Sequence, residues 1–372
     1  MSALLVMAVC ATTAFAQTEV LVTGLRSPQR LALTSGGNFL VTESGTQNNT
    51  SRVAFVTRGG TVRGLIEALP SGADFQGDQS GATALALRER TLYVTIGVGD
   101  TERRNQAGLA IHNGEAPASA LFATVLRFRF SSDIDQITGT FRLTDASRQS
   151  LANGEEVELT DGAGARVMAM VLSFMPVSIP EGPAYRFSNP WGLAVSNDGN
   201  TVWMNDASQD ALYRIDAATG RWQRVFRFAG APNPTPIGPP RIDAVPTSVR
   251  LYNNQLLVSF LSGFPFLQGG ARVAVVDPAT RTETTFISGL SSATDVIWRE
   301  RGDARPQFFV LEFSTNMLSN PAGPGRLLRY DTETPTVVAG DLIAPVSMAY
   351  NASTQELFIL ELSGRILRVA LQ

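Results

Sequence analysis

The sequence predicts an all-β fold, namely a six-bladed β-propeller with four-stranded antiparallel blades. The first observation is that short apolar runs alternate with Gly, Pro, Asn and Asp, while no segment keeps a helical period over a convincing length. The second is that a three-strand pattern recurs six times in the 372 residues, at intervals of about 50 residues with one longer gap. Four strands at such a period are typical of a propeller blade.

The six copies share three strand-like segments, which we expect to be the inner three strands of each blade. The first segments cover residues 28–33, 82–87, 190–195, 246–251, 293–298 and 345–350. The second cover 39–43, 92–96, 202–206, 256–260, 308–312 and 357–361, and the third cover 52–56, 121–125, 212–215, 272–276, 326–330 and 365–369. The last copy ends after its third strand, so the N-terminal strand at residues 19–23 is predicted to join this last blade and remove its free edge.

Residues 17–372 are interpreted as a single propeller domain with an insertion at about 131–185, after blade two. The insertion contains strand-like runs at 140–144 and 166–172. We favour an elaborated outer strand and loop of blade two, and a degenerate seventh blade stays open as the alternative.

Residues 1–16 are predicted to be a signal peptide. The stretch Leu4–Phe15 is apolar but too short for a stable membrane anchor, and Ala14-Phe15-Ala16 fits a signal-peptidase site. No basic residue precedes this run, and a buried N-terminal helix is the alternative. Cleavage near Ala16 would remove Cys10, the single cysteine, and yield a secreted or periplasmic protein.

The charged residues exclude several kinds of chemistry. The chain is lysine-free, because all 30 basic residues are Arg, and this excludes a Schiff-base or P-loop lysine. His112 is the single histidine and lies in a polar loop, so a His-pair zinc site is excluded. The formal net charge of −3 argues against nucleic acid as a partner. The groups that remain available for chemistry or binding are carboxylates, amides, hydroxyls, arginines, aromatic rings or a bound ion.

Five motifs carry a resemblance to a known family. They are Ser188-Asn-Pro-Trp-Gly-Leu, Ile242-Asp-Ala-Val-Pro-Thr-Ser, Leu261-Ser-Gly-Phe-Pro-Phe, Gly270-Ala-Arg and Gly323-Pro-Gly-Arg-Leu. Together they resemble the ScyD/ScyE family of secreted bacterial propellers, which are NHL-like. The resemblance covers most of the chain outside the insertion. It implies the propeller fold and secretion, and it leaves the activity open because most members of the family have none assigned.

The geometry of a blade predicts where a site would lie. The first two strands are antiparallel, so the start of the first and the end of the second meet on one face, around the channel mouth. This predicts an inner ring of Arg30, Thr83, Asn189, Trp191, Thr247, Asp295 and Ser347, and a second ring of Glu43, Asp206, Phe260, Glu312 and Glu361. The candidate ligand-binding residues are Arg30, Asn189, Trp191, Asp206, Thr247, Phe264, Phe266, Asp295 and Glu312. The candidate ligand is a small molecule, a protein or a peptide.

One interpretation of these residues is a metal site. Asn189, Asp206 and Asp295 would hold a divalent cation such as Ca²⁺, which prefers oxygen ligands, and Glu312 would act as a base. This gives a metal-dependent hydrolase of the lactonase kind.

The competing interpretation is structural. Glu43, Glu312 and Glu361 would each pair with the Arg that starts the following strand, at positions 52, 326 and 365. The Pro-rich segment 231–240 cannot be a central strand and is expected to form a stiff loop beside Phe264 and Phe266. The two loops would be a lid, a docking edge or a mere connection.

Binding without catalysis is the favoured function and the metal-dependent hydrolase is the alternative. A quinoprotein sugar dehydrogenase is a third reading, for which the catalytic histidine has no evident counterpart. No catalytic residue is assigned, a divalent cation is the one cofactor considered, no membrane span is expected, and the protein is expected to be a monomer.

Overall fold

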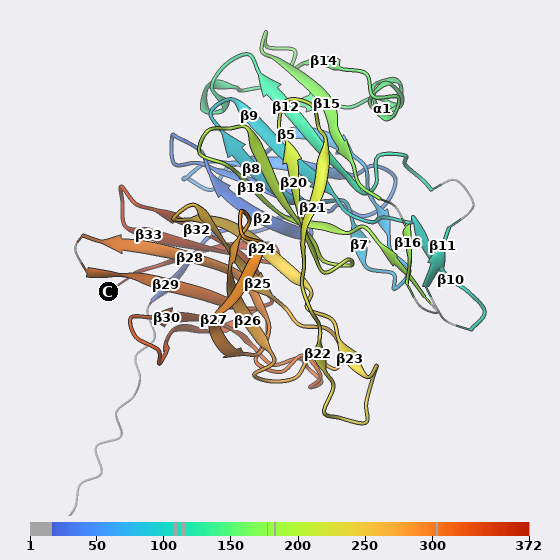
Figure 1. Cartoon of the computed structure of the whole chain (residues 1–372). Coiled ribbons are helices and arrows are strands. Elements are labelled where there is room, and N and C mark those ends of the chain that lie inside the picture. Colours follow the sequence, from blue (N-terminus) through green and yellow to red (C-terminus); the bar gives the residue numbers. More distant parts are fainter. Residues whose placement is uncertain are drawn as a thin grey trace, which may run out of the picture.

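A computed structural model describes residues 17–371 except 108–109, 114–116, 177, 182–183 and 303. These residues form a six-bladed β-propeller, so the predicted fold is confirmed. Each blade contains four antiparallel strands, and blades one and two carry one strand more (Figure 1). The predicted signal peptide, residues 1–16, lies outside the described residues.

From the inner strand outward, the first four strands of each blade follow the order of the chain, except that the outer strand of blade six comes from the N-terminal part of the chain. Blade one has β2 (Pro28–Leu33), β3 (Phe39–Glu43), β4 (Ser51–Val56) and β5 (Val62–Leu69), and blade two has β8 (Ala82–Arg88), β9 (Thr91–Ile96), β12 (Thr124–Phe130) and β15 (Arg166–Phe174). Blade three has β18 (Pro190–Val195), β19 (Thr201–Asp206), β20 (Ala211–Asp216) and β21 (Trp222–Arg227). Blade four has β24 (Pro246–Tyr252), β25 (Gln255–Phe260), β26 (Ala271–Asp277) and β27 (Thr282–Leu290). Blade five has β28 (Ala293–Arg301), β29 (Ala304–Glu312), β30 (Gly325–Tyr330) and β31 (Thr336–Leu342), and blade six has β32 (Pro345–Asn351), β33 (Glu356–Glu361), β34 (Arg365–Val369) and β1 (Thr18–Val22).

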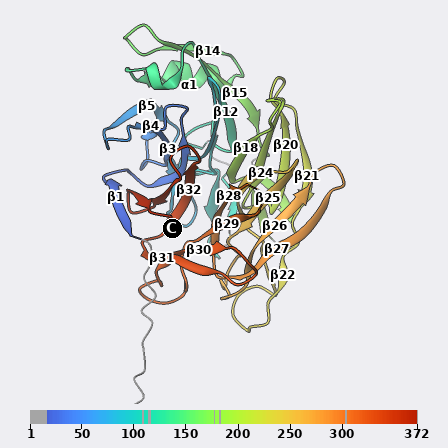
Figure 2. The same ribbon diagram turned by 90° about the vertical axis from the view of Figure 1, so that its left-hand side faces the viewer.

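The ring is closed by strands from opposite ends of the sequence. β1 pairs antiparallel with β34, with Thr18 opposite Val369 and Val20 opposite Leu367. The inner strands contact one another in the cyclic order β2, β8, β18, β24, β28, β32 and back to β2. Every inner strand therefore has a neighbour on both sides, and Figure 2 shows four of them, β18, β24, β28 and β32, near the middle of the molecule.

The hydrophobic core lies between neighbouring blades. Phe39 of blade one packs edge-on against Phe358 of blade six, and Phe228 packs in the same way against Phe260 of blade four, each pair with ring centroids 4.8 Å apart. Both faces of a blade are covered in this way, so the second strands are mostly buried, including polar residues such as Thr42, Thr95 and Asn205.

The insertion at 131–185 joins blades one and two on the outside of the propeller. β14 (Val157–Thr160) extends blade two beyond β15, while β13 (Phe141–Arg142) pairs parallel with β5 of blade one. Between them lies α1 (Asp145–Ala152), which is capped by Thr144. Near the short helix η1 (Ile134–Gln136), the Asp135 carboxylate accepts hydrogen bonds from Thr34, Gly36 and Asn38 of blade one. These bonds fix the start of the insertion to the propeller.

The inner strands share a backbone irregularity that positions the site. In blades one, three, four, five and six, the register with the second strand slips by one residue directly after the first residue of the inner strand. The residues left without a partner are Gln29, Trp191, Thr247, Thr294 and Val346, and in blade two a wider irregularity includes Thr83. Such β-bulges redirect side chains, commonly next to binding sites.

Candidate functional site

A cavity of about 600 Å³ opens at the mouth of the channel. All six bulged residues line it: Gln29, Thr83, Trp191, Thr247, Thr294 and Val346. Residues that follow the second strands add Val98, Ala207, Leu261, Phe313 and Leu362. The cavity therefore draws on every blade, and its volume suits a small organic molecule.

The bulged threonines have a structural task. Thr83 donates a hydrogen bond of 2.6 Å to the carbonyl of Pro190, Thr247 one of 2.9 Å to Ala293, and Thr294 one of 3.1 Å to Pro345. Each acceptor is the first residue of the next inner strand, so these hydroxyls tie neighbouring blades together.

The other three bulged positions carry Gln29, Trp191 and Val346, which have no such bond between side chain and neighbouring blade among the described residues. Trp191 stands where blades two, four and five have a threonine that bonds the next blade, and it is one of the residues that line the cavity. Its side chain is thus available to a ligand.

Asn189 and Asp206 lie together at the edge of blade three. Asp206 is fully buried and accepts hydrogen bonds from the Ser188 hydroxyl (2.6 Å) and from the backbone N–H groups of Asn189 and Gln209 (3.0 Å each). Burial raises the pKa of Asp206 to about 6, against the effect of these bonds. Asn189 lines the cavity, and its buried Oδ1 has no hydrogen-bond partner in the described structure.

Arg30 and Asp295 lie deeper in the channel, one position beyond the bulges. Asp295 binds Arg250 through both oxygens, at 3.1 and 2.6 Å, and accepts further bonds from Ser347 and the Met348 N–H. Burial opposes the ionisation of Asp295, but the guanidiniums of Arg250 and Arg30 hold its pKa below the usual value. Neither Arg30 nor Asp295 lines the cavity at the mouth.

Arg30 spans the channel. Its Nη2 donates to the Thr247 carbonyl at 2.9 Å and to the Trp191 carbonyl at 3.4 Å, and burial lowers the pKa of Arg30 to about 10. Arg30 and Asp295 thus form a floor below the bulged residues. The prediction that Asp295 shares a cation with Asn189 and Asp206 stays a prediction, and both carboxylates already have several hydrogen-bond donors.

The predicted Glu–Arg pairs are confirmed. Glu361 binds Arg365 at 2.5 Å and also accepts the N–H of Ile343 at 2.7 Å. Glu43 and Glu312 make the equivalent contacts, with Arg52 and Arg326 and with one loop N–H each. Glu312 is completely buried in its pair and does not line the cavity.

Blade four replaces this pair with another contact. Phe260 occupies the position of the glutamates, and Arg272 lies opposite it with its guanidinium 4.1 Å from the ring centroid. A cation–π contact therefore takes the place of the ion pair.

The segment 231–240, between blades three and four, contacts Phe264 in the loop after β25, and neither 231–240 nor Phe264–Phe266 lines the cavity. Phe264 lies against Gly238, where an added Cβ would be 2.7 Å from the ring. The segment 231–240 starts a hairpin of β22 (Ala231–Pro232) and β23 (Arg241–Ile242), in which Ile237 is 56% exposed. Phe264 and Phe266 do not line the mouth cavity, so the structure places them beside the site.

Sequence reasoning missed the acidic side of the mouth. Asp74 and Asp78 line the cavity from a hairpin of β6 (Gly72–Ala73) and β7 (Gln79–Ser80), between blades one and two. Asp74 Oδ1 accepts the N–H groups of Gln76 and Asp78, at 2.8 and 3.0 Å, and burial raises the pKa of Asp74. The only sequence signal was the pattern of Asp, Gly and Gln at 74–79, which also fits a plain turn.

Glu102 lies near this hairpin, in the strand β10 (Glu102–Arg104) that pairs with β11 (Ala110–His112). It is 8% exposed, and burial together with the charge of Asp74 raises the pKa of Glu102 to about 8. His112 stands opposite Glu102 in the pairing register, and its side chain is exposed.

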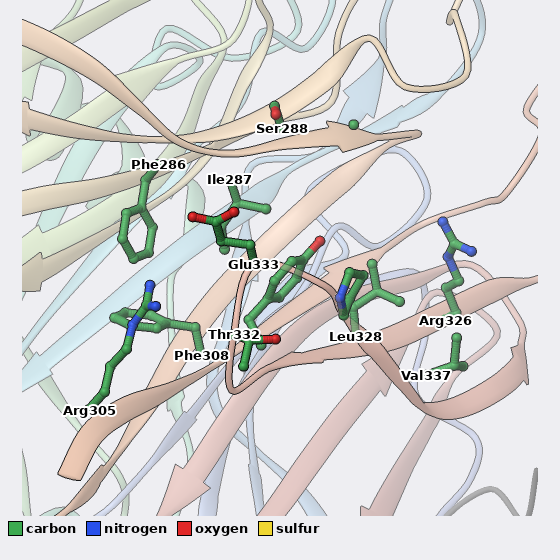
Figure 3. A pocket seen from close by; sticks show the side chains of 13 residues that line it. Phe286, Ile287, Ser288, Arg305, Phe308, Arg326, Leu328, Thr332, Glu333 and Val337 are labelled. Atoms are coloured by element: carbon green, nitrogen blue, oxygen red, sulfur yellow. The ribbon is translucent and has the colours of Figure 1, made fainter.

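A second hollow, of about 650 Å³, lies between the outer parts of blades four and five. It is lined by Phe286 of β27 and by Phe308, Arg326 and Tyr330 of β29 and β30, and Figure 3 shows Arg305 beside Phe308. Only two blades contribute to this outer groove, and Arg326 is occupied by Glu312. The mouth cavity is therefore the better candidate site.

Within the residues that the structure describes, no group of three or more His, Cys, Asp and Glu side chains is arranged to hold a metal ion. No described helix has the length and apolar character needed to cross a membrane.

Comparisons with known proteins define the class of this molecule but not a particular family. No family model matches the chain, and no curated protein matches it. Three solved structures from Bacteroides thetaiotaomicron share the fold. A protein of unknown function is 11% identical with a TM-score of 0.53, covering 95% of this chain and 76% of that one.

The names of the other two structures state a function. An auxiliary nutrient binding protein is 9% identical with a TM-score of 0.52, covering 94% of this chain and 69% of that one. A protein named as a phosphatase candidate is 8% identical with a TM-score of 0.53, covering 94% and 72%. Identities this low establish the β-propeller architecture alone.

Proposed function

We propose that this protein is a secreted or periplasmic β-propeller of the ScyD/ScyE type that binds a small molecule at the channel mouth without catalysing a reaction. The observation that carries the proposal is the ring of bulged residues around the 600 Å³ cavity. Three of them, the threonines, form hydrogen bonds to the next blade. Trp191, Gln29 and Val346 line the cavity and make no such bond among the described residues.

Further features support binding over chemistry. The buried Oδ1 of Asn189 has no partner and would accept a hydrogen bond from a ligand. Asp295 in the channel and Glu312 at the end of β29 are each bound to an arginine, so neither carboxylate is free to act as a nucleophile or base. One neighbour in fold is named as a nutrient binding protein, which agrees with this role. The five sequence motifs support the ScyD/ScyE assignment, and residues 1–16 support export.

A thermal-shift screen of small molecules tests the proposal, with wild type compared with Trp191→Ala. Trp222→Ala is the matched control, because Trp222 is 42% exposed on the outer strand of blade three. We expect compounds that raise the melting temperature of wild type and of the control but not of Trp191→Ala. A ligand at a hundred times its Kd stabilises the folded state by about 2.7 kcal/mol. Ligands that stabilise all three proteins equally would show that the mouth is not the site.

The metal-dependent hydrolase is the second candidate. The observation in its favour is the pairing of Asp206 with Asn189, whose side-chain oxygen lacks a partner. It is less favoured because a cation would have to replace the existing donors to Asp206 and Asp295.

A further inference from the structure

The side chains at the mouth are unevenly distributed. The charged residues among those that line the cavity are Asp74 and Asp78, and both come from the hairpin between blades one and two. Across the channel, blades four and five contribute Leu261, Phe313 and Met317. One side of the mouth is thus acidic and the opposite side is apolar.

The carboxylates are free to meet a ligand. Asp74 uses one oxygen for the hairpin amides, and Oδ2 has no hydrogen bond in the described structure. Asp78 is exposed, and its carboxylate likewise has no hydrogen bond or ion pair there. Arg104, at the end of β10, is a nearby cation: its guanidinium lies over the Phe75 ring, 5.0 Å from its centroid, and donates to the Phe75 carbonyl. It does not line the cavity.

Trp191 of blade three stands between the two sides. An indole face attracts a cation through the ring quadrupole, and it also packs against apolar groups. The buried Arg30 does not neutralise the negative charge of Asp74 and Asp78. It lies in the floor of the cavity beside Asp295, and its guanidinium is bound to two backbone carbonyls. The mouth therefore presents an uncompensated negative side, an apolar side and an aromatic ring.

We propose that the ligand is an amphipathic organic cation, with an ammonium or similar group toward Asp74 and Asp78 and an apolar body against Leu261, Phe313 and Met317. This inference rests on the proposed function and names the ligand class for the same cavity. A neutral polar ligand would not need two free carboxylates, and an anionic one would be repelled by them. The volume of about 600 Å³ admits a body of drug-like size.

Three compounds with one apolar body test the charge preference: 4-phenylbutylamine, 4-phenylbutanol and 4-phenylbutyrate, titrated by calorimetry at neutral pH. We expect the amine to bind about tenfold more tightly than the alcohol and the carboxylate to bind weakest, in keeping with one or two partly exposed ion pairs. Added salt should weaken the binding of the amine, because it screens the charges, and leave the binding of the alcohol nearly unchanged.

Variants assign the effect to the mouth. In the double variant Asp74→Asn and Asp78→Asn, the amine should bind no more tightly than the alcohol. Asp145→Asn is the matched control, because its side chain is 99% exposed on α1. Trp191→Ala should weaken the binding of the amine and of the alcohol alike. Arg305→Ala, in the outer groove, should weaken the binding of neither.

The outcomes separate the two proposals. If amine and alcohol bind equally and both depend on Trp191, the cation preference is wrong while binding at the mouth stands. If the amine preference survives the double Asp variant or is lost in Arg305→Ala, the assignment to these carboxylates is wrong. If none of the three compounds binds, the cation proposal is overturned, and the thermal-shift screen decides the proposed function on its own.

Discussion

The guanidinium of Arg30 in blade one lies 3.5 Å from the carboxylate of Asp295 in blade five, and both side chains are buried in the middle of the propeller. Arg250 of blade four and Met348 of blade six bind the same carboxylate. The network therefore connects four blades across the channel. It explains why an acid stands inside an apolar inner strand, a feature that the sequence also allowed to be a metal ligand.

Replacing Asp295 should strongly destabilise the protein. Asp295→Ala leaves Arg30 and Arg250 buried without their counter-charge, which costs about 3–5 kcal/mol for a buried pair. Urea denaturation of the variant measures this loss. Asp145→Asn, on the surface of α1, should change the free energy of unfolding by less than about 0.5 kcal/mol. A loss equally small for Asp295→Ala would mean that the network does not stabilise the ring.

The packing of blades three and four depends on Gly192. A Cβ at this position would lie 3.1 Å from the Thr247 carbonyl oxygen and 3.2 Å from the Val249 nitrogen, both in the backbone of β24. Gly192→Ala should cost about 1–3 kcal/mol, because the two inner strands would have to move apart. Gly59→Ala is the control, since the nearest atom to its added Cβ is 3.8 Å away. Equal stability of the two variants would show that the strands separate without cost.

Glu102 should make stability depend on pH. Its pKa is raised from 4.5 to about 8 in the folded protein, so the folded state keeps a proton that the unfolded state releases between these values. The folded state consequently loses stability as the pH rises from about 4.5 to about 8. Glu102→Gln cannot titrate, and it should match wild type at pH 4 but be more stable at pH 9. Thermal melts of both proteins across this range measure the difference, and parallel curves would contradict it.

The Phe loop should be dispensable for small-molecule binding. Phe264 is 44% exposed and does not line the mouth cavity. Phe264→Ser should therefore leave ligand affinity within about twofold of wild type, measured by the same calorimetry as Trp191→Ala. Loss of affinity in the Phe264 variant alone would move the site from the channel mouth to the loops of blade four.

Divalent cations should not stabilise the protein. The oxygens of Asp206 and Asp295 already accept bonds from hydroxyl, amide or guanidinium donors. We expect Ca²⁺, Zn²⁺ or a chelator to leave the melting temperature unchanged. A saturable rise with one equivalent of either ion, lost in Asp206→Asn, would instead favour the hydrolase.

The sequence predicted the architecture well, because the blade repeat appears in strand patterns and residues 19–23 were needed to complete the last blade. The Glu–Arg pairs were also predictable, since Glu361 and Arg365 must face each other across a short antiparallel turn. Oppositely charged residues on either side of a short turn predict such a cross-strand pair directly.

The exact lining of the mouth was less predictable. Strict alternation along an inner strand does not reveal a bulge, so Arg30, Asp295 and Ser347 were placed in one ring with Trp191 and Thr247. The register slip separates them: Trp191 and Thr247 line the cavity, while Arg30 and Asp295 lie in its floor. Asp74 was missed because its approach to the mouth depends on how a hairpin between two blades folds back, which no local pattern records.

The pairing of β1 with β34 also determines when the molecule can become complete. Blade six needs a strand from each end of the chain, so the ring cannot close during synthesis until the C-terminal strand has been made. Before β34 has been synthesised, β1 has no strand to pair with, and the facing sides of blades one and six are exposed to solvent. A permuted chain that joins Thr18 to the C-terminus through a linker and opens at the exposed Gly238, between blades three and four, would carry the four strands of every blade contiguously. Such a chain would turn the long-range pairing of β1 with β34 into a hairpin.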